Sequence, residues 1–513
     1  MVRLLDPYGR PIPKAMFEAV NQARRLKSWI PSDLHINALL QYGAETLRNR
    51  SRQMVRDNGY AANGADSFCA NLIGTGIKPS VITEEGSGIS EETKKEIQWL
   101  WFDWVDEADA DGINNFYGMQ AVVAKEIFEA GEAFIRFRPR RFSDGLAVPL
   151  QLQLLEAEQL PIEDQSFTGT GNPIRCGIEF DAIGRRSAYH FYKRHPGDAT
   201  EMNEVGEKTR VPASEVLHIY PASRAGQIRG LPRMVASIVK MFILDQYDDA
   251  ELDRKKVAAL FAGFVTSPEE NSPLMGETQE GEAYLEPGTM QKLLPGEDVR
   301  FSSPAEVGGS YESFQYRTLL QIACGLGMPY SSVSGDLRQT SYSSIRAGLI
   351  EFQRRMRQLL FNVIVHQMCR PVWQRFVEIA VLSKALEKAG LADIRKLQRR
   401  VKWIPPKWEW VDPYKEIMAI RASIRAGVIS RDFAIEQLGL EPDEVDESAA
   451  AGNRRADKLK LAFDSDPRRV SNAGVGQDGR SLLPKEKEEE VDQDGGDQEE
   501  ENGDGTDEGN NDE

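Results

Sequence analysis

Cysteine and histidine are scarce in this sequence, and neither forms a metal or redox motif. The four cysteines lie far apart without a CxxC pair: Cys69, Cys176, Cys324 and Cys369. This spacing indicates buried free thiols in a reducing compartment rather than disulfides or a metal site. The five histidines are isolated and lack metal-ligand spacing: His35, His190, His195, His218 and His366. We therefore expect no metal and no cofactor.

Long apolar runs and catalytic motifs are also missing. No run approaches the ~20 apolar residues of a membrane-spanning helix, and the start MVRLLDP lacks the apolar segment of a secreted precursor. There is no GxxxxGK[ST], HExxH or GxSxG, which argues against an enzyme. Ser343 and Ser344 have no local histidine to activate them, so we expect them to cap a helix. A two-metal nuclease, which needs several converging carboxylates, stays open as an alternative.

Negative charge is concentrated at one end of the chain. The net charge is −17, but Glu486–Glu513 contains fifteen acidic residues and a single lysine. The rest is only slightly acidic and has no dominant basic face. Such a body does not favour tight binding to DNA, because tight binding depends on many basic contacts to phosphate groups. From Ser465 onward, Gly, Asp, Glu, Asn and Gln dominate and predict a disordered tail.

The first part of the chain is predicted to form helices followed by strands. Helices are expected over Ala15–Trp29, His35–Arg56, Ala61–Ile73, Ser90–Ala108 and Asn115–Ala130. Asn58-Gly59 predicts a glycine C-cap for the second helix. Strands are expected over Glu132–Arg138, Pro149–Leu155, Cys176–Asp181, Ser187–Lys193 and Val216–Tyr220, with a hairpin about Ile183-Gly184. Together these elements predict one α/β domain.

Two side-chain patterns on these helices leave alternatives open. Arg48, Arg52 and Arg56 recur at fourfold spacing, hence on one helix face. Such a stripe is usually solvated or salt-bridged, and contact with nucleic acid is the alternative. The aromatic cluster of Trp99, Trp101, Phe102 and Trp104 indicates a core or a subunit interface.

The middle of the chain predicts two helices around a short β-containing insertion. The first runs from Met234 to Ala262 and is acidic in its middle, and strands and turns follow from Gly263. A second amphipathic run from Phe314 is expected to stop at Gly325 and Gly327. Pro329 and Gly335-Asp336 predict a polar loop, and hydroxyls between Ser341 and Ser344 predict the start of a long helix.

The last part of the folded chain predicts further helices. A helix is expected over Pro371–Ala389, and Val401–Val411 is expected to be extended because it contains Pro405-Pro406. Helices are then expected over Tyr414–Ala426, from Ser430 to Gly439, and over Glu444–Phe463.

The segment IACGLGMPY followed by SGDLRQTSYSSIRAGLIEF resembles the signature of the lambda-type family of tailed-phage portal proteins. The matching residues are Gly325, Leu326, Gly327, Pro329, Tyr330, Gly335, Asp336, Tyr342, Ser343, Ser344, Arg346 and Phe352. Ser341 stands where the family pattern has Asn. Blocks at Arg48–Pro79, Arg224–Ala262, Pro287–Pro304 and Trp410–Arg431 resemble the same family in the same order.

The resemblance implies an α+β portal-type fold. Its expected parts are an N-terminal α/β wing over 1–230, a stem helix over 231–262 and a β-containing clip over 263–310. A second stem helix is expected over 311–326 and a tunnel loop over 327–341. The remaining expected parts are a long wing helix with a return segment over 342–411, crown helices over 412–464 and the disordered acidic tail over 465–513.

The resemblance also implies a ring, usually of twelve copies, at one capsid vertex. Such a ring is a channel for packaging and ejection of double-stranded DNA without sequence specificity, with no membrane involved. The implied protein partners are the terminase large subunit, the major capsid protein and head–tail connector proteins. The implied location is the virion, after assembly in the host cytoplasm. The implied DNA-facing residues of the tunnel loop are Asp336, Leu337, Arg338, Gln339 and Thr340. Another ring-forming head–tail connector is the alternative, besides the nuclease.

Overall fold

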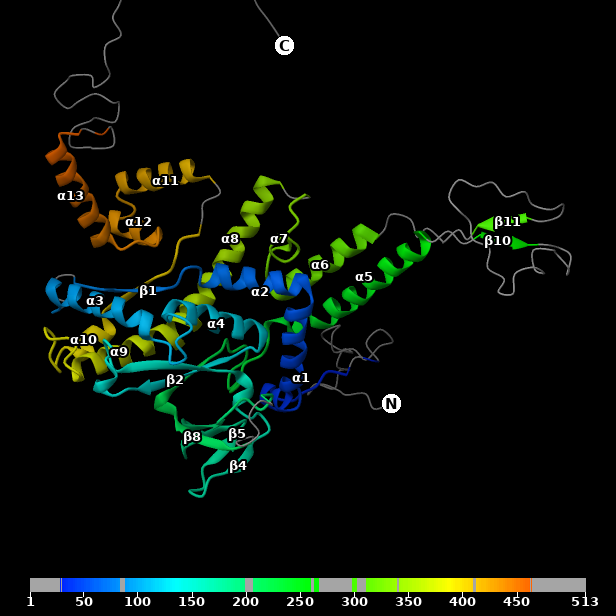
Figure 1. Ribbon diagram of the computed structural model, residues 1–513, viewed down its shortest axis with the longest axis horizontal. Helices are drawn as coiled ribbons and strands as arrows, with labels where there is room; N and C mark the ends of the chain where they lie inside the picture. Colours follow the sequence, from blue (N-terminus) through cyan, green and yellow to red (C-terminus); the bar gives the residue numbers. More distant parts are fainter. Residues whose placement is uncertain are drawn as a thin grey trace, which may run out of the picture. The chain divides into compact units, whose positions relative to one another are not determined.

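The computed structural model describes residues 28, 30–83, 88–198, 206–259, 263–266, 298–301, 311–338, 341–408, 412–461 and 463. The chain divides into two compact units, Met1–Glu441 and Pro442–Glu513, each described here by itself (Figure 1). The predicted helix Ala15–Trp29, apart from Ser28, and the predicted tail over 465–513 lie outside the described residues.

The first two helices meet at a single residue, Asn58. Helix α1 (Ile36–Asp57) ends at this residue, and α2 (Gly59–Leu72) begins directly after it. The Asn58 side chain accepts hydrogen bonds from the N–H groups of Tyr60 and Ala61, as an N-cap does. The predicted C-cap at Gly59 is therefore wrong, because Asn58 performs the capping and Gly59 is the first residue of α2.

Helices α3 (Glu91–Glu107) and α4 (Phe116–Glu129) carry an aromatic core. Trp101 and Trp104 are buried, and the ring centroid of Trp101 lies 4.9 Å from that of Phe376. Trp104 Nε1 donates to the carbonyl oxygen of Leu150 at 2.8 Å. The predicted core position of the tryptophan cluster is confirmed for these two residues, whereas other aromatic side chains of the cluster point outward.

Two antiparallel sheets follow these helices. The first has the order β3-β2-β9, formed by β2 (Ala133–Pro139), β3 (Leu150–Leu155) and β9 (Val216–Ile219). The second has the order β4-β5-β6-β7-β8. Its strands are β4 (Gln165–Phe167), β5 (Pro173–Arg175), β6 (Ile178–Phe180), β7 (Arg186–Tyr192) and β8 (Lys208–Pro212).

The predicted strands and the hairpin about Ile183-Gly184 are confirmed, but three strands of the second sheet were not predicted. Strands β4 and β5 have three residues each, too few for an alternating pattern to emerge. Strand β8 has an intermediate or exposed side chain at every position except Val211, so its apolar signal is weak.

A buried ion pair joins both sheets to the segment that leaves them. Arg229 and Glu132 are 0% and 1% exposed, and Arg229 Nε donates to Glu132 Oε1 at 2.8 Å. The guanidinium also donates to the backbone carbonyls of Ala157, Leu160 and Cys176. The second carboxylate oxygen accepts the N–H of Gly230 at 2.7 Å and lies 2.9 Å from His218 Nε2.

Two glycines allow the backbone segments that carry Glu132 and Arg229 to come into close contact. Gly131 has φ +88, and a Cβ added there would lie 2.2 Å from the carbonyl carbon of Leu231. A Cβ added to Gly230 would lie 2.2 Å from the oxygen of Gly131. Side chains at either position would push the two backbone segments apart, so the ion pair depends on glycine at both.

A pair of antiparallel helices projects from this body, as Figure 1 shows. A short 3-10 turn, η6 (Arg233–Ala236), precedes α5 (Ile238–Ala259), and α6 (Tyr311–Leu326) runs back along it. Asp248 accepts hydrogen bonds from the Tyr311 hydroxyl at 2.9 Å and from Gln315 Nε2 at 3.1 Å. The α-helix begins later than the predicted Met234, because the chain first makes the 3-10 turn. Between the two helices, β10 (Gly263–Thr266) pairs antiparallel with β11 (Asp298–Phe301), as the predicted insertion requires.

A long helical path then returns through the body. It consists of α8 (Tyr342–Leu359), a π-helical stretch (Leu360–Cys369) and α9 (Arg370–Leu382). The path ends before the predicted Ala389, because Lys384 adopts a left-handed backbone with φ +61 that terminates the helix. Helix α10 (Ile394–Arg399) follows, and β12 (Val401–Ile404) pairs antiparallel with β1 (Lys78–Val81).

The last helices belong to different units. Helices α11 (Pro413–Arg425) and α12 (Arg431–Gln437) lie in the first unit, and α13 (Pro442–Leu459) lies in the second. The predicted helices are present, but the unit boundary falls inside the expected crown. Along the residues that the structure describes, no helix combines the length and apolarity needed to cross a membrane.

We expect the stability of the first unit to fall between pH 6.5 and about 4 because of His218. Burial lowers the pKa of His218 from 6.5 to about 4, against the opposing effect of the Glu132 carboxylate. Below pH 6.5 the unfolded chain binds a proton at this histidine that the folded chain does not bind, so acid favours unfolding. The full effect is about 3 kcal/mol.

Urea denaturation at pH 7.5, 5.5 and 4.5 measures this loss. His218→Gln is the control, because its amide can still donate to Glu132 but does not titrate. The variant should lose less free energy of unfolding between pH 6.5 and 4 than the wild type. Equal losses in the two proteins would show that His218 does not cause the acid sensitivity.

Candidate functional site

The predicted site residues lie on one continuous turn between α6 and α8. Helix α6 ends at Leu326, a short helix α7 (Tyr330–Ser334) follows, and α8 begins at Tyr342. The predicted loop over 327–341 therefore contains a helix. Pro329 is disfavoured inside a helix but is the N-cap residue of α7, where its missing N–H costs nothing.

Gly325 lies inside α6 and does not stop it, contrary to the prediction. A Cβ at this position would lie 2.1 Å from Ser237 Oγ. Ser237 is buried, and its hydroxyl donates to the carbonyl oxygen of Ile322 at 2.9 Å. The glycine thus allows α6 to pack closely against the residue that precedes α5.

Gly327 and Arg233 together end α6. Gly327 has φ +68, and Arg233 Nε donates to the carbonyl oxygen of Leu326 at 2.8 Å. The guanidinium lies 4.9 Å from the ring centroid of Phe68. Burial, with a contribution from nearby Arg355, lowers the pKa of Arg233 to about 10, so it stays charged at neutral pH and stabilises the negative end of the helix.

Helix α7 is fixed to the body by α2 and α6. Asn63 Nδ2 donates to the backbone carbonyls of Ser332 at 3.1 Å and Val333 at 3.0 Å. Val333 is fully buried, and the ring centroid of Tyr330 lies 4.8 Å from that of Tyr316. The first half of the predicted tunnel loop is therefore a packed element.

In the second half of the predicted loop, Leu337 and Arg338 are exposed, and Arg338 pairs with the partly buried Asp336. Gly335 ends α7 in a left-handed conformation, φ +71. Arg338 Nε donates to Asp336 Oδ1 at 3.0 Å, and this hydrogen bond lowers the pKa of Asp336 and raises that of Arg338. Leu337 is 58% exposed. The predicted residues Gln339 and Thr340 lie outside the described residues.

The remaining motif residues start α8. Ser341 Oγ accepts the N–H of Ser344, and Ser344 Oγ accepts the N–H of Ser341 at 3.0 Å. This reciprocal arrangement is a capping box, which confirms the predicted capping role for Ser344, whereas the side chain of Ser343 lies outside the described part of the structure. Tyr342 and Ser343 form the first turn, and Arg346 is exposed. In the part of the motif that the structure describes, the residues shape a connection and bring no catalytic group together.

The sequence analysis missed a second feature, an exposed apolar surface on α5. We call it the α5 face: Val239, Phe242, Ile243 and Tyr247 are 62%, 52%, 56% and 38% exposed. These positions follow helical spacing, and Tyr247, at one edge of the face, also packs against Phe314 of α6 with ring centroids 5.0 Å apart. The sequence analysis described this helix only by its acidic middle, which begins at Asp245, whereas most of the apolar positions come before it.

The basic stripe of α1 is a salt-bridged structure. Arg48 is buried, and Arg52 contacts the carboxylates of Glu126, Glu129 and Glu158 at 2.8, 3.3 and 2.9 Å. Hydrogen bonds to Arg52 lower the pKa of Glu158, although its burial acts in the opposite direction. The salt-bridged interpretation is confirmed, and the stripe is not a free phosphate-binding surface.

One group of possible metal ligands occurs among the described residues. Single ligand atoms of Glu156, Glu158 and His195 lie within 4.8 Å of one another. Glu158 already accepts two hydrogen bonds from Arg52, which occupy the oxygens a metal would need. The donor set therefore fits an ion-paired surface better than a metal centre.

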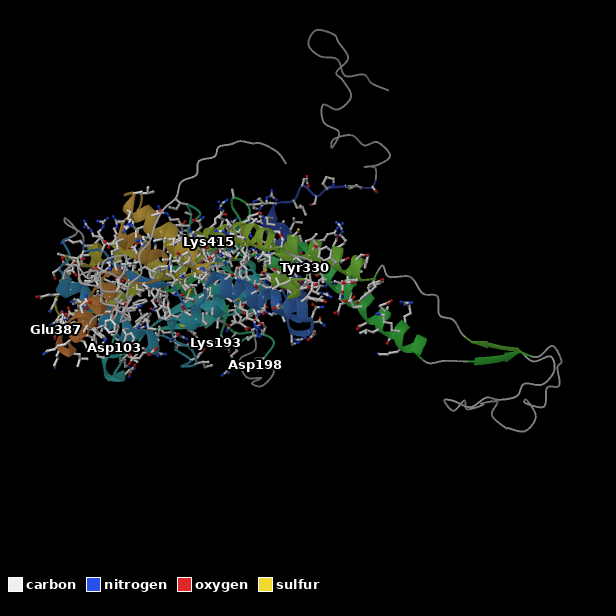
Figure 2. The ribbon with its side chains drawn as sticks, turned by 90° about the horizontal axis from the view of Figure 1, so that it is seen from above. Asp103, Lys193, Asp198, Tyr330, Glu387 and Lys415 are labelled. Carbon is white, nitrogen blue, oxygen red and sulfur yellow. The ribbon has the colours of Figure 1, made fainter. Side chains whose placement is uncertain are left out.

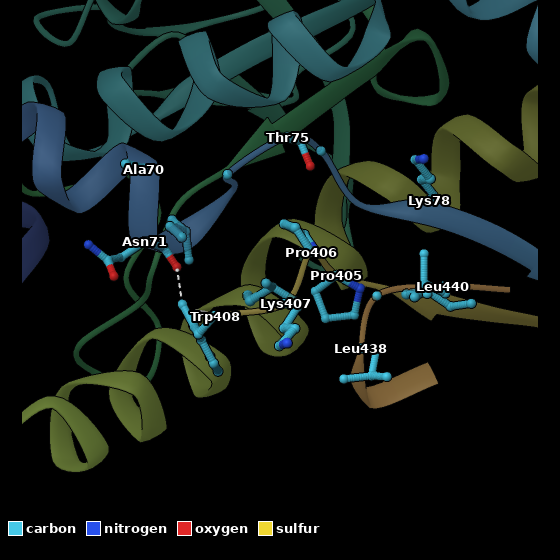
Figure 3. A pocket seen from close by; sticks show the side chains of 16 residues that line it. Ala70, Asn71, Thr75, Lys78, Pro405, Pro406, Lys407, Trp408, Leu438 and Leu440 are labelled. Atoms are coloured by element: carbon cyan, nitrogen blue, oxygen red, sulfur yellow. Dashed lines mark hydrogen bonds between the residues drawn. The ribbon is translucent and has the colours of Figure 1, made fainter. Parts of the chain in front are cut away.

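A cavity of about 390 Å³ lies between the end of α2 and the segment after β12 (Figure 3). Trp408 Nε1 donates to the carbonyl oxygen of Asn71 at 3.2 Å across its edge. The polar side chains at the cavity are Asn71, Thr75, Lys78 and Lys407. Its lining has no His, Cys, Asp or Glu, so it offers no set of metal ligands and no carboxylate or imidazole for acid–base chemistry.

Comparisons with known proteins identify relatives along most of the chain. Residues 22–359 match the family model described as "Phage portal protein, lambda family". A probable portal protein of Halomonas phage phiHAP-1 is 24% identical, with 87% of each chain covered. Portal protein B of Escherichia phage lambda is 22% identical, with 82% of this chain and 86% of that protein covered. A chain from the neck of a native GTA particle, computed with C12 symmetry, is 14% identical, with a TM-score of 0.44, 77% of this chain and 94% of that chain covered.

We expect Gly327→Ala to cost more stability than Gly335→Ala. Both glycines have a left-handed backbone, at φ +68 and +71, which costs an alanine roughly 1–2 kcal/mol. A Cβ at Gly327 would also lie 2.9 Å from Arg233 Nη2, whereas nothing lies within 4 Å at Gly335. The difference between the two losses, measured by urea denaturation, isolates the contact with Arg233. Equal losses of stability in the two variants would mean that the position of Arg233 does not depend on a glycine at position 327.

Proposed function

The chain belongs to the lambda family of phage portal proteins, and on this premise we propose that it forms a ring at one vertex of the capsid. Double-stranded DNA would pass through the central channel during packaging and ejection, without sequence readout. The family is structural and non-enzymatic, in keeping with a connection motif built only from caps and turns. The observation that carries the proposal is the family match over residues 22–359.

The proposed parts of the ring subunit follow the elements described above. The body up to 230 is the wing, with α8 as its long helix, and α5 and α6 are the stem. The β10–β11 pair belongs to the clip, and α11 to α13 belong to the crown. The clip would dock the terminase large subunit and later the head–tail connector proteins, and the wing would meet the major capsid protein. The location is the virion, after assembly in the host cytoplasm.

The α5 face supports contact between copies. Four apolar side chains at helical spacing remain exposed on a helix that projects from the body. A cyclic ring closes through heterologous contacts, in which one surface of a subunit meets a different surface of the next. Burial of Phe242 and its neighbours on an adjacent subunit would remove this apolar surface from water.

The charge of the stem and of the turn supports passage of DNA without tight binding. Asp245 and Asp249 are exposed on α5, and Arg338 is already paired with Asp336. A paired arginine offers phosphate groups only a weak, exchangeable contact. The segment 336–338 is therefore suited to touch a moving duplex and release it.

A head–tail connector ring is the alternative with the same symmetry. The family match favours a portal, since it begins at residue 22 and includes the stem segments and the turn between α6 and α8. Ring height in negative stain separates the two, because the proposed portal has a wing, a stem and a clip at different levels.

We expect purified protein to assemble into rings of about twelve chains through the α5 face. Mass photometry should give about twelve times the 57.5 kDa chain mass. The double variant Val239→Asp/Phe242→Asp should release smaller species, because charges at a closed apolar contact are costly. The matched control, Phe167→Asp/Ile183→Asp, changes equally exposed side chains of the second sheet and should leave rings intact. A wild type that stays monomeric at micromolar concentration would overturn the ring.

We expect deletion of Leu337–Thr340 to leave rings intact but to lower the amount of full-length DNA retained in heads. Leu337 and Arg338 are exposed and contribute little to the core, whereas the proposed position of the segment faces the channel. Complementation of a portal-deficient phage, followed by quantification of packaged DNA, measures the effect. In a second variant, Gly-Ser-Gly-Ser replaces the four residues. This variant keeps the length of the segment but lacks the Arg338–Asp336 pair, so comparison with the deletion separates the effect of length from the effect of the pair. Heads that fill and stay full with the deletion would refute the channel position.

A further inference from the structure

Helix α3 presents an aromatic pair to solvent. Trp99 is 69% exposed and Phe102 is 66% exposed. Their ring centroids are 6.3 Å apart, and the ring planes meet at 80°. Edge-to-face contact of this kind holds both rings in a defined arrangement. Exposure of large aromatic side chains to water is unfavourable in free energy, so burial of this pair by a binding partner would be favourable.

The pair does not serve the core of the body. Trp101 and Trp104, on the opposite side of the same helix, are 5% and 0% exposed and fill the core. Positions 99 and 102 are one helical turn apart and face away from that core. Burial of Trp101 and Trp104 in the core does not require aromatic residues at positions 99 and 102, where polar residues would serve equally well.

The charges around the pair are mainly acidic. Asp103 and Asp106 are exposed on α3 beside the two rings. Among the described residues, neither carboxylate has an ion-pair partner. Lys95 is the one basic residue among the exposed positions of α3. The surface thus combines two aromatic faces with unneutralised negative charge.

The helix that carries the pair is held rigidly. Glu96 accepts hydrogen bonds from the N–H groups of Glu387 and Lys388 at 2.9 and 3.0 Å. Glu92 forms an ion pair with Lys388 at 3.2 Å. At the other end, Glu107 accepts the N–H of Ala147 at 2.9 Å. Because the helix is held at both ends, little conformational entropy is lost when a partner binds to this surface, which favours a higher affinity.

The pair lies at the end of the body away from the stem helices. Figure 1 shows α3, α9 and α10 at one end and α5 and α6 at the other. Seen from above in Figure 2, Asp103 and Glu387 lie at that same end, far from Tyr330. If the stem surrounds the channel, this end of the wing points away from the ring axis.

We propose that the α3 patch, formed by Trp99, Phe102, Asp103 and Asp106, docks an arginine- or lysine-bearing segment of the protein that forms the surrounding capsid shell. This proposal rests on the proposed portal function. A guanidinium can stack on the face of Trp99 while it pairs with a neighbouring carboxylate, and indole is the strongest side-chain partner for a cation. An apolar residue of the same segment covers Phe102. Charge and shape both disfavour an acidic partner.

Binding of purified major capsid protein to preformed portal rings tests the proposal. Biolayer interferometry at low and physiological salt should give an affinity about tenfold or more weaker for Trp99→Ala/Phe102→Ala than for wild type. Asp103→Asn/Asp106→Asn should weaken binding at low salt and reduce its salt dependence. The control Phe142→Ala/Ile183→Ala removes equally exposed apolar side chains elsewhere and should bind like wild type. All four α3 positions are exposed, so these substitutions leave the core untouched.

Mass photometry of the same samples separates this proposal from the ring itself. Wild-type protein that forms no ring would refute the proposed function. Wild-type rings that do not bind the capsid protein, or that bind it equally well after Trp99→Ala/Phe102→Ala, would overturn the docking surface. Rings that fall apart on this substitution would make the patch a contact between copies and would also overturn it.

Discussion

The buried contact between Glu132 and Arg229 is the constraint on which the rest of the first unit depends. It exists only because Gly131 and Gly230 let two backbone segments touch. Arg229 then reaches carbonyl groups of the segment between the two sheets and of the β5–β6 turn, while Glu132 directly precedes β2, the central strand of the first sheet. Removing one partner would leave a buried charge without compensation, which costs about 3–5 kcal/mol. The two sheets and the segment that leads to α5 are therefore fixed as one piece.

The same short segment also positions the helices that project from the body. Arg229 fastens it to the sheets, and Arg233, four residues later, holds the end of α6 through the carbonyl oxygen of Leu326. The orientation of α5 and α6 is thus set by two half-buried or buried cations that flank Gly230 and Pro232. Any movement of the proposed stem relative to the wing has to break one of these contacts, which favours a rigid ring subunit.

The residues that most resemble the family have structural roles in this protein. Gly327, Pro329, Gly335 and Ser344 end or start helices, and the charged side chains of the motif at the surface include Arg346 besides the Asp336–Arg338 pair. These roles fit a structural, non-enzymatic family, in which the motif fixes where helices begin and end. The surfaces that we propose for partner binding lie elsewhere, on α5 and α3, and expose apolar and aromatic side chains.

The sequence alone determined the local structure and the family. Helical periodicity, the Ser341 cap and the Gly327 stop are decided within a few residues, so α1, α6 and α8 could be predicted to within a few positions. The motif around Gly325–Ser344 carried the family resemblance in the same local way. Contacts between distant residues could not be predicted. The pairing of Glu132 with Arg229, the burial of Arg48 and the exposure of Trp99 beside a buried Trp101 each depend on which elements pack together. Only the tertiary structure decided these, because the side a residue faces is set by neighbours far away in the chain.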